Sequence, residues 1–354
     1  MEKERNIGID LLRIVLMYMI CTLHTLSHGG VLGNAKSTIN FFGMWALYEL
    51  FNCAVNAYAL ISGYFAQDKP QNYKRIIKLW FTAFFYSVGI AIIINVIAYF
   101  TNAIEPLNSR EFLECLLPAT FGNWYFRAYF ALFFLAPFIN KALSSINKDE
   151  SRKLLIIILF VFSALSTVYD NWFSNGLHAF WLLILYIIGA LMKKGEVFAN
   201  TKTIILVIIF FVSSILSWFF GLFLDIKPWR MYTSPTIILA AMVLLILFTR
   251  ISIKNTTINK IVKFIAPLTF GVYLVHDNFY VSKMLIDDSF VFVTNYNLII
   301  GAIMVLSIAL TIFIICLFIE MIRNKIFKLI KIDTIIEKII EKISLLLDRI
   351  TSII

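Results

Sequence analysis

The stretch IGIDLLRIVLMYMICTLHTLSH, residues 7–28, is long enough and apolar enough to cross a lipid bilayer as a helix. It nevertheless carries four polar or titratable side chains, namely Asp10, Arg13, His24 and His28. Such groups are costly at membrane depth, so they usually face other helices and take part in function. The stretch therefore predicts a first membrane helix with one polar face.

The rest of the chain has the same apolar character. Of its 354 residues, 60% are hydrophobic, and the mean hydropathy is +0.86. A soluble protein of this size could not bury so much apolar surface. We therefore expect an all-α, polytopic membrane domain over residues 1–320. The ten apolar runs that could span lie at 7–29, 41–65, 76–100, 124–146, 153–170, 178–192, 203–224, 234–249, 264–281 and 297–319.

The basic residues orient this bundle. Of the 31 Lys and Arg residues, 24 fall on the side of the N-terminus when the ten spans alternate, and five fall on the other side. The remaining two, Arg13 and Arg127, lie in the membrane. Because cytoplasmic segments are enriched in Lys and Arg, both termini are expected in the cytoplasm. The net charge of +10 thus reflects topology, and we expect no nucleic-acid partner.

The tail, residues 321–354, predicts an amphipathic helix. Its isoleucines and leucines recur at helical spacing with Lys and Glu between them. Such a helix is expected to lie along the cytoplasmic face of the bilayer, attracted to anionic lipid. A coiled-coil contact with a second subunit, giving a homodimer through this helix, is the alternative.

The polar residues of the first stretch share one helical face. Eleven residues separate Arg13 from His24, which brings them onto the same side about 16 Å apart along the axis. Asp10, three residues before Arg13, lies within reach of an ion pair, which is the alternative to a functional role for Arg13. His24 and His28 have a spacing that suits a metal, but no further ligand set accompanies them, so we expect no metal.

The second span carries a polar line of its own: Glu49, Asn52 and Asn56, with Gly63 continuing it. The two asparagines could hydrogen-bond across helices, whereas Glu49 is harder to explain structurally. Gly63 permits close approach of a neighbouring helix.

A basic cluster, Lys74, Arg75 and Lys78, opens the third span. It suits an anionic ligand or the ordinary excess of cytoplasmic cations.

Polar and aromatic residues also mark the outer ends of the fourth and ninth spans. Trp124 and Tyr125 are typical of an interfacial aromatic belt. Arg127 could extend to the surface or bind an anion, and His276 with Asp277 approaches the same face. We therefore expect a polar cavity that opens to the outside.

At these residues the sequence resembles the membrane-bound acyltransferase-3 family, which includes O-acetyltransferases of bacterial surface glycans. Four landmarks carry the resemblance in chain order. They are R-x10-H (Arg13, His24), SG[FY] (Ser62, Gly63, Tyr64), W-[FY] with a distal proline (Trp124, Tyr125, Pro137), and [ST]-F-G-x-Y-L-x-H (Thr269, Phe270, Gly271, Tyr273, Leu274, His276). The chain departs from the family in one basic pair, since Arg75 and Lys78 stand where two arginines are usual.

The resemblance implies an enzyme of a bacterial plasma membrane that moves an acyl group, usually acetyl, from cytoplasmic acetyl-CoA to a hydroxyl outside. The acceptor would be a cell-surface polysaccharide or a lipid-linked sugar. On this basis His24 is the candidate general base, and Glu49 is the candidate group that orients it. Arg13 would hold the donor, with Arg75 and Lys78 on the nucleotide phosphates.

For the acceptor we assign Arg127, Trp124, His276 and Asn56. The motifs G-x-S-x-G and H-E-x-x-H are absent from the sequence, so it gives no support to a serine hydrolase or a zinc protease.

Transport is the rival class of function. Ten helices with intramembrane Arg, Glu and His could export or flip a lipid-linked sugar, with His24 as a proton relay. Paired interrupted helices would favour this alternative, and the sequence shows none. In a third class, a membrane sensor or scaffold, mutation of the polar residues would have no effect on activity.

Overall fold

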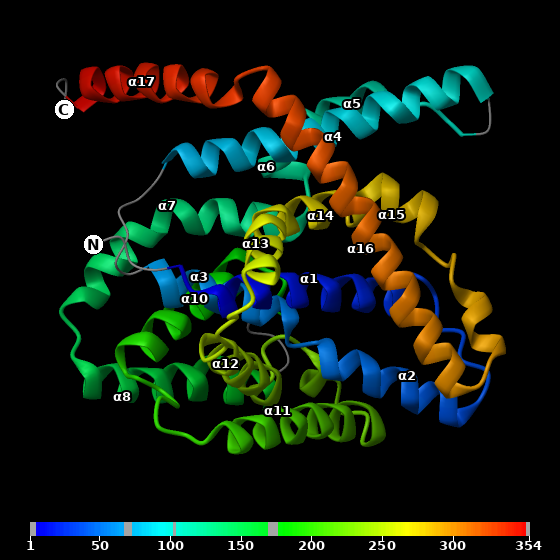
Figure 1. Cartoon of the computed structure of the whole chain (residues 1–354), viewed down its shortest axis with the longest axis vertical. Coiled ribbons are helices and arrows are strands. Elements are labelled where there is room, and N and C mark those ends of the chain that lie inside the picture. The colour runs from blue at the N-terminus through cyan, green and yellow to red at the C-terminus, as the bar shows by residue number, and fades with distance from the viewer. Residues whose placement is uncertain (1–4, 67–72, 102–103, 169–175, 352–354) are drawn as a thin grey trace.

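A computed structural model of the chain describes residues 5–66, 73–101, 104–168 and 176–351, and within these ranges all regular secondary structure is helical (Figure 1). The α-helices are α1 Ile7–Ser27, α2 Thr38–Phe51, α3 Ala54–Ala66, α4 Tyr73–Thr101, α5 Ser109–Cys115, α6 Pro118–Phe121, α7 Trp124–Ser144, α8 Lys148–Leu159, α9 Leu165–Val168, α10 Ala179–Lys194, α11 Thr203–Trp218, α12 Pro235–Thr249, α13 Thr256–Ile265, α14 Thr269–His276, α15 Phe279–Leu285, α16 Leu298–Leu329 and α17 Ile332–Thr351. Short π and 3-10 turns continue or link several of them.

Eight helical stretches in the described residues are long and apolar enough to cross a membrane, which confirms an all-α polytopic membrane protein. The stretches are Ile7–Ser27, Tyr73–Thr101, Trp124–Ser144, Lys148–Val168, Thr203–Phe223, Lys227–Thr249, Thr256–His276 and Leu298–Leu329. The remaining two expected spans, at 41–65 and 178–192, are helical but shorter than a full crossing.

The expected span at 41–65 is broken into α2 and α3. The break falls at Asn52 and Cys53, and the Asn52 amide donates to the Glu49 carboxylate at 3.0 Å and to the Arg230 carbonyl oxygen at 2.9 Å. Asn52 thus ties the break to the segment around Arg230. The ninth span is also interrupted, by the 3-10 turn Ala266–Leu268 between α13 and α14. The sequence showed no sign of either interruption.

Helix α10 spans only 16 residues because it lies inside the bundle, where Trp181, Leu182 and Leu185 are buried. It packs chiefly on α3, and Gly63 makes that contact possible. A Cβ at Gly63 would lie 1.8 Å from the Tyr186 carbonyl oxygen, so no larger residue fits. The close approach expected at Gly63 is confirmed.

Helix α1 runs through the middle of the bundle, with α3, α12, α14 and α16 among its neighbours (Figure 1). Leu12 and Leu16 are fully buried between these helices. Large apolar side chains on the outer helices, such as Phe100 on α4 and Ile299 on α16, stay exposed, as expected of surfaces that face lipid. The middle of the polar face of α1 is buried, whereas Arg13 and His28 toward its two ends stay partly exposed.

The tail forms the amphipathic helix α17, which packs antiparallel along the start of α4 (Figure 1). Lys78 Nζ donates to Asp333 Oδ1 at 2.8 Å, and Lys74 Nζ to Glu337 Oε1 at 2.5 Å. The hydrogen bond from Lys78 lowers the pKa of Asp333 below its ordinary value. Ile336 is fully buried in this contact. The apolar face of the tail thus turns, at least in part, onto the protein itself.

Candidate active site

The N-terminal end of α1, which the sequence predicts to face the cytoplasm, carries a charged cluster. Arg13 Nη1 donates to Asp10 Oδ1 at 2.9 Å, as the spacing of three predicts, and Arg5 also pairs with Asp10. Asp10 is buried, whereas the side chains of Arg13 and Arg5 remain 31% and 49% exposed. Two guanidinium groups against one carboxylate leave a net positive charge at this end. Arg5 was not among the predicted site residues, since its position outside the first span made it an ordinary cytoplasmic cation.

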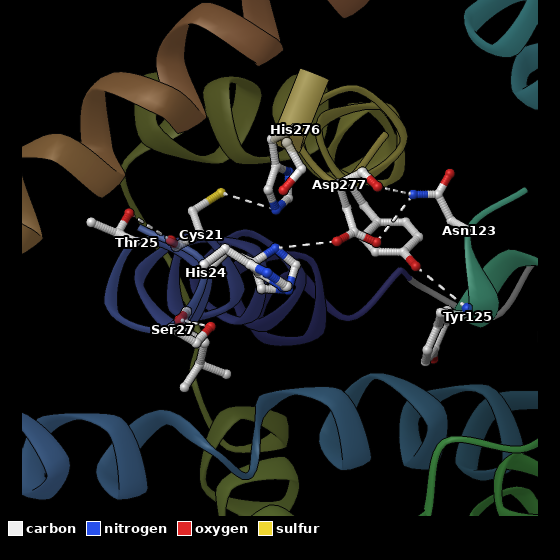
Figure 2. Close-up of polar contacts among 12 residues, drawn as sticks. Cys21, His24, Thr25, Ser27, Asn123, Tyr125, His276 and Asp277 are labelled. Carbon is white, nitrogen blue, oxygen red and sulfur yellow. Dashed lines mark hydrogen bonds and ion pairs between the residues drawn. The ribbon is translucent and has the colours of Figure 1, made fainter. Parts of the chain in front are cut away.

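The C-terminal end of α1, predicted to face the outside, places His24 against the end of α14. His24 Nδ1 lies 3.5 Å from Asp277 Oδ1, and the His24 ring lies 5.0 Å from the ring of His276 and 5.0 Å from that of His28 (Figure 2). The His24 side chain is 21% exposed, so it is reachable yet mostly enclosed. A carboxylate beside an imidazole can hold its orientation and stabilise its protonated form.

Asp277 is itself held in place by Asn123. The Asn123 amide donates to the Asp277 backbone oxygen at 2.5 Å and to Asp277 Oδ2 at 3.1 Å (Figure 2). Asn123 precedes the first residue of α7, and Asp277 follows the last residue of α14. The approach of these two helix ends therefore fixes the carboxylate that faces His24. Sequence reasoning noted Asp277 but gave it no role, because the two helix ends are distant in the chain.

His276 lies behind His24, in a buried position. Its Nδ1 lies 2.7 Å from the Val272 backbone oxygen, and its Nε2 lies 4.0 Å from Cys21 Sγ. A ring nitrogen that bonds a carbonyl must donate, so Nε2 of the neutral ring is the acceptor and faces the thiol. These contacts give His276 a role in packing α14 onto α1, and its predicted contact with the acceptor stays a prediction.

Glu49 lies near the end of α2, where it contacts Asn52. Its Oε2 accepts from Asn52, and its Oε1 is buried with no hydrogen-bond partner among the described residues. The carboxylate that the structure places beside His24 is therefore Asp277, and the suggested Glu49 pairing is not what the geometry shows.

Asn56 hydrogen-bonds to other parts of the bundle, which agrees with the expectation that the two asparagines could hydrogen-bond across helices. Its Nδ2 donates to the backbone oxygen of Tyr232 at 2.7 Å, and its Oδ1 accepts from Trp181 Nε1 at 3.2 Å. The Trp124 ring stacks at 6.4 Å on the Tyr232 ring. Both residues thus hold the segment around Tyr232, and a role for either in binding the acceptor remains a prediction.

Arg127 turns to the surface rather than to His24. Its Nη1 donates to the Thr120 backbone oxygen at 3.0 Å in an exposed contact. The side chain extends to the surface, and its role in binding the acceptor stays a prediction.

Lys78 and Arg75 lie at the start of α4, where Lys78 meets the acidic face of α17. A donor that used Lys78 would therefore compete with Asp333. The assignment of both cations to nucleotide phosphates stays a prediction.

One group of side chains has the arrangement of a metal site. The ligating atoms of His24, His28 and Asp277, referred to below as the outer trio, lie within 4.8 Å of one another. The third member, Asp277, directly follows α14, which is why spacing within the first helix did not reveal it. Two imidazoles and a carboxylate are a ligand set that Zn²⁺ accepts.

Comparison with protein families gives one match, to the family described as an acyltransferase domain, over residues 6–318. Comparison with curated proteins and with solved structures gave no match. The matched range begins before α1 and reaches into α16, so it takes in the whole bundle and both ends of the polar face of α1. The chain therefore belongs to the acyltransferase-3 family of membrane acyltransferases.

Proposed function

We propose that the protein is an O-acetyltransferase of a bacterial plasma membrane. It moves an acetyl group from cytoplasmic acetyl-CoA to a hydroxyl of a cell-surface polysaccharide or a lipid-linked sugar. The observation that carries the proposal is the pairing of His24 with Asp277 at the outer end of α1, the helix whose inner end carries Arg13. Acyl transfer to a hydroxyl needs a base of this kind, and the donor needs a cationic site on the cytoplasmic side.

In the proposed reaction the neutral imidazole of His24 removes the proton of the acceptor hydroxyl. The oxygen attacks the thioester carbonyl carbon, an O–C bond forms, and the C–S bond breaks. The departing sulfur of CoA takes the proton back from the imidazolium. Asp277, at 3.5 Å from Nδ1, stabilises the imidazolium while the proton resides on it.

The donor would be held from the cytoplasmic side. Arg13 and Arg5 together carry more positive charge than Asp10 neutralises, and guanidinium groups bind phosphate through paired hydrogen bonds. Arg75 and Lys78 would add contacts to the nucleotide. For Lys78 this requires that its ion pair with Asp333 on α17 be broken.

The test uses isolated membranes and radiolabelled acetyl-CoA. Wild-type membranes should transfer label to surface glycan, and His24→Ala should reduce the labelling by a factor of about 10² or more while the protein remains at its normal level. His178→Ala is the matched control, because His178 lies at the exposed start of α10, away from this site. Normal labelling by His24→Ala would refute the proposal.

The interrupted spans, α2 with α3 and α13 with α14, are the observation that favours a transporter or flippase of a lipid-linked sugar. The same assay separates the two functions. A transporter moves the sugar across the membrane but leaves no label on it.

A further inference from the structure

A cavity of about 480 Å³ lies beside Asp277, between α4, α5, α6, α14 and α15. Asn123 and Asp277, the two residues that meet at His24, form part of its wall. A molecule in this cavity therefore lies next to the group that faces the proposed base.

The lining of the cavity is acidic and aromatic. Glu111 and Glu114 come from α5, and Tyr280 and Phe279 come from α15. Glu111 Oε2 accepts from the Asn108 backbone at 2.9 Å, and Glu114 Oε1 accepts from Arg110 Nε at 3.1 Å. Within the described residues the second oxygen of each carboxylate has no hydrogen-bond partner.

This combination has a clear chemical preference. Carboxylate oxygens only accept hydrogen bonds, so they bind groups rich in O–H or N–H donors. Aromatic rings pack on the apolar C–H faces of a sugar ring. Three carboxylates, counting Asp277, line one cavity, so an anionic ligand there meets repulsion and lost hydration.

We propose that this cavity is the acceptor site and that it takes a neutral or amino sugar unit and rejects an anionic one. The assignment rests on the proposed function, since it names the acceptor of the same reaction. Glu111 and Glu114 bind the hydroxyl or amino groups of the ring, and Asn123 and Asp277 separate that ring from His24. The acceptor hydroxyl reaches His24 past the Asp277 side chain.

The experiment uses the full-length protein in lipid nanodiscs, acetyl-CoA, and three acceptor probes: the octyl β-glycosides of glucose, glucosamine and glucuronic acid. Glucoside and glucosaminide should be acetylated with a kcat/KM at least about tenfold above that of the glucuronide. Glu114→Gln should raise the KM for the glucosaminide roughly ten- to hundredfold and leave the KM for acetyl-CoA unchanged. Glu105→Gln, an exposed change outside the cavity, is the matched control.

A double variant, Glu111→Gln with Glu114→Gln, should bring the kcat/KM for the glucuronide closer to the kcat/KM for the glucoside. An unchanged acceptor KM and unchanged selectivity in these variants, with active wild type, would overturn the acceptor assignment alone. The acceptor assignment alone would also be overturned if membranes showed labelling that depends on His24 while none of the three glycosides was acetylated. Membranes without such labelling would overturn the proposed function and the assignment together.

Discussion

The contact between His24 and Asp277 makes the sharpest prediction. Asp277→Asn keeps the size and shape of the side chain and removes its charge, so it leaves the Asn123 contact close to its present geometry. In the proposed reaction the imidazole of His24 becomes positive only as the hydroxyl loses its proton. The change should therefore slow the chemical step and leave binding of acetyl-CoA unaltered.

The size of the effect follows from the geometry. At the observed 3.5 Å, and with an effective dielectric constant of about 20, two full charges attract each other by about 5 kcal/mol. The amide that replaces the carboxylate would recover part of this through its dipole. We expect a loss of about 3 to 4 kcal/mol in the transition state, which lowers kcat by a factor of about 10² to 10³.

The assay measures acetyl transfer at saturating acetyl-CoA, together with the thermal unfolding of the purified protein. Asp287→Asn is the matched control, because Asp287 faces His28 at 4.0 Å with 44% of its side chain exposed. This control should stay within about twofold of wild type, since exposed pairs contribute little. If Asp277→Asn kept more than a third of the wild-type kcat while His24→Ala was inactive, the carboxylate would have no part in the chemistry.

Three further perturbations test other parts of the structure. Gly63→Ala should push α3 from α10 and lower the melting temperature by several degrees, whereas Gly89→Ala, where a Cβ meets nothing within 4 Å, should not. Added Zn²⁺ should bind the outer trio and inhibit transfer, EDTA alone should have no effect, and His28→Ala should weaken the inhibition; inhibition that ignores His28 would count against the trio. Because the pKa of Asp333 is lowered in the folded protein, its contribution to docking of α17 is present above the ordinary Asp pKa of about 3.9 and is lost as pH falls below it. A fluorescence distance between α17 and α4 should then increase at low pH, and Lys78→Gln should reduce that pH dependence to the part that the Lys74–Glu337 pair contributes.

The bundle itself could be predicted because its signal is local. Runs of apolar residues mark the spans, and the spacing of three between Asp10 and Arg13 predicts their ion pair. The break between α2 and α3 has no such local signal. At this break the Asn52 side chain donates a hydrogen bond to the backbone oxygen of Arg230, which is 178 positions away in the chain.

The partner of His24 could not be predicted for a similar reason. Glu49 and Asp277 are both carboxylates near the outer half of the bundle, and the sequence alone offers no way to choose between them. The choice depends on where the C-terminal end of α14 meets α1, and on Asn123, which holds Asp277 there. Periodicity places residues on a face of one helix, but it does not say which helix lies opposite.

The polar face of α1 also constrains how a donor could reach His24. Arg13 and His24 lie about 16 Å apart along the helix axis, and Met17 and Ile20 occupy the same face between them. Both of these side chains are buried, at 2% and 7% exposure. The pantetheine arm of CoA, if it extends from phosphates at Arg13 toward His24, must therefore displace apolar side chains along α1. Because methionine is unbranched and adapts its shape readily, Met17 is the residue on this path best suited to move.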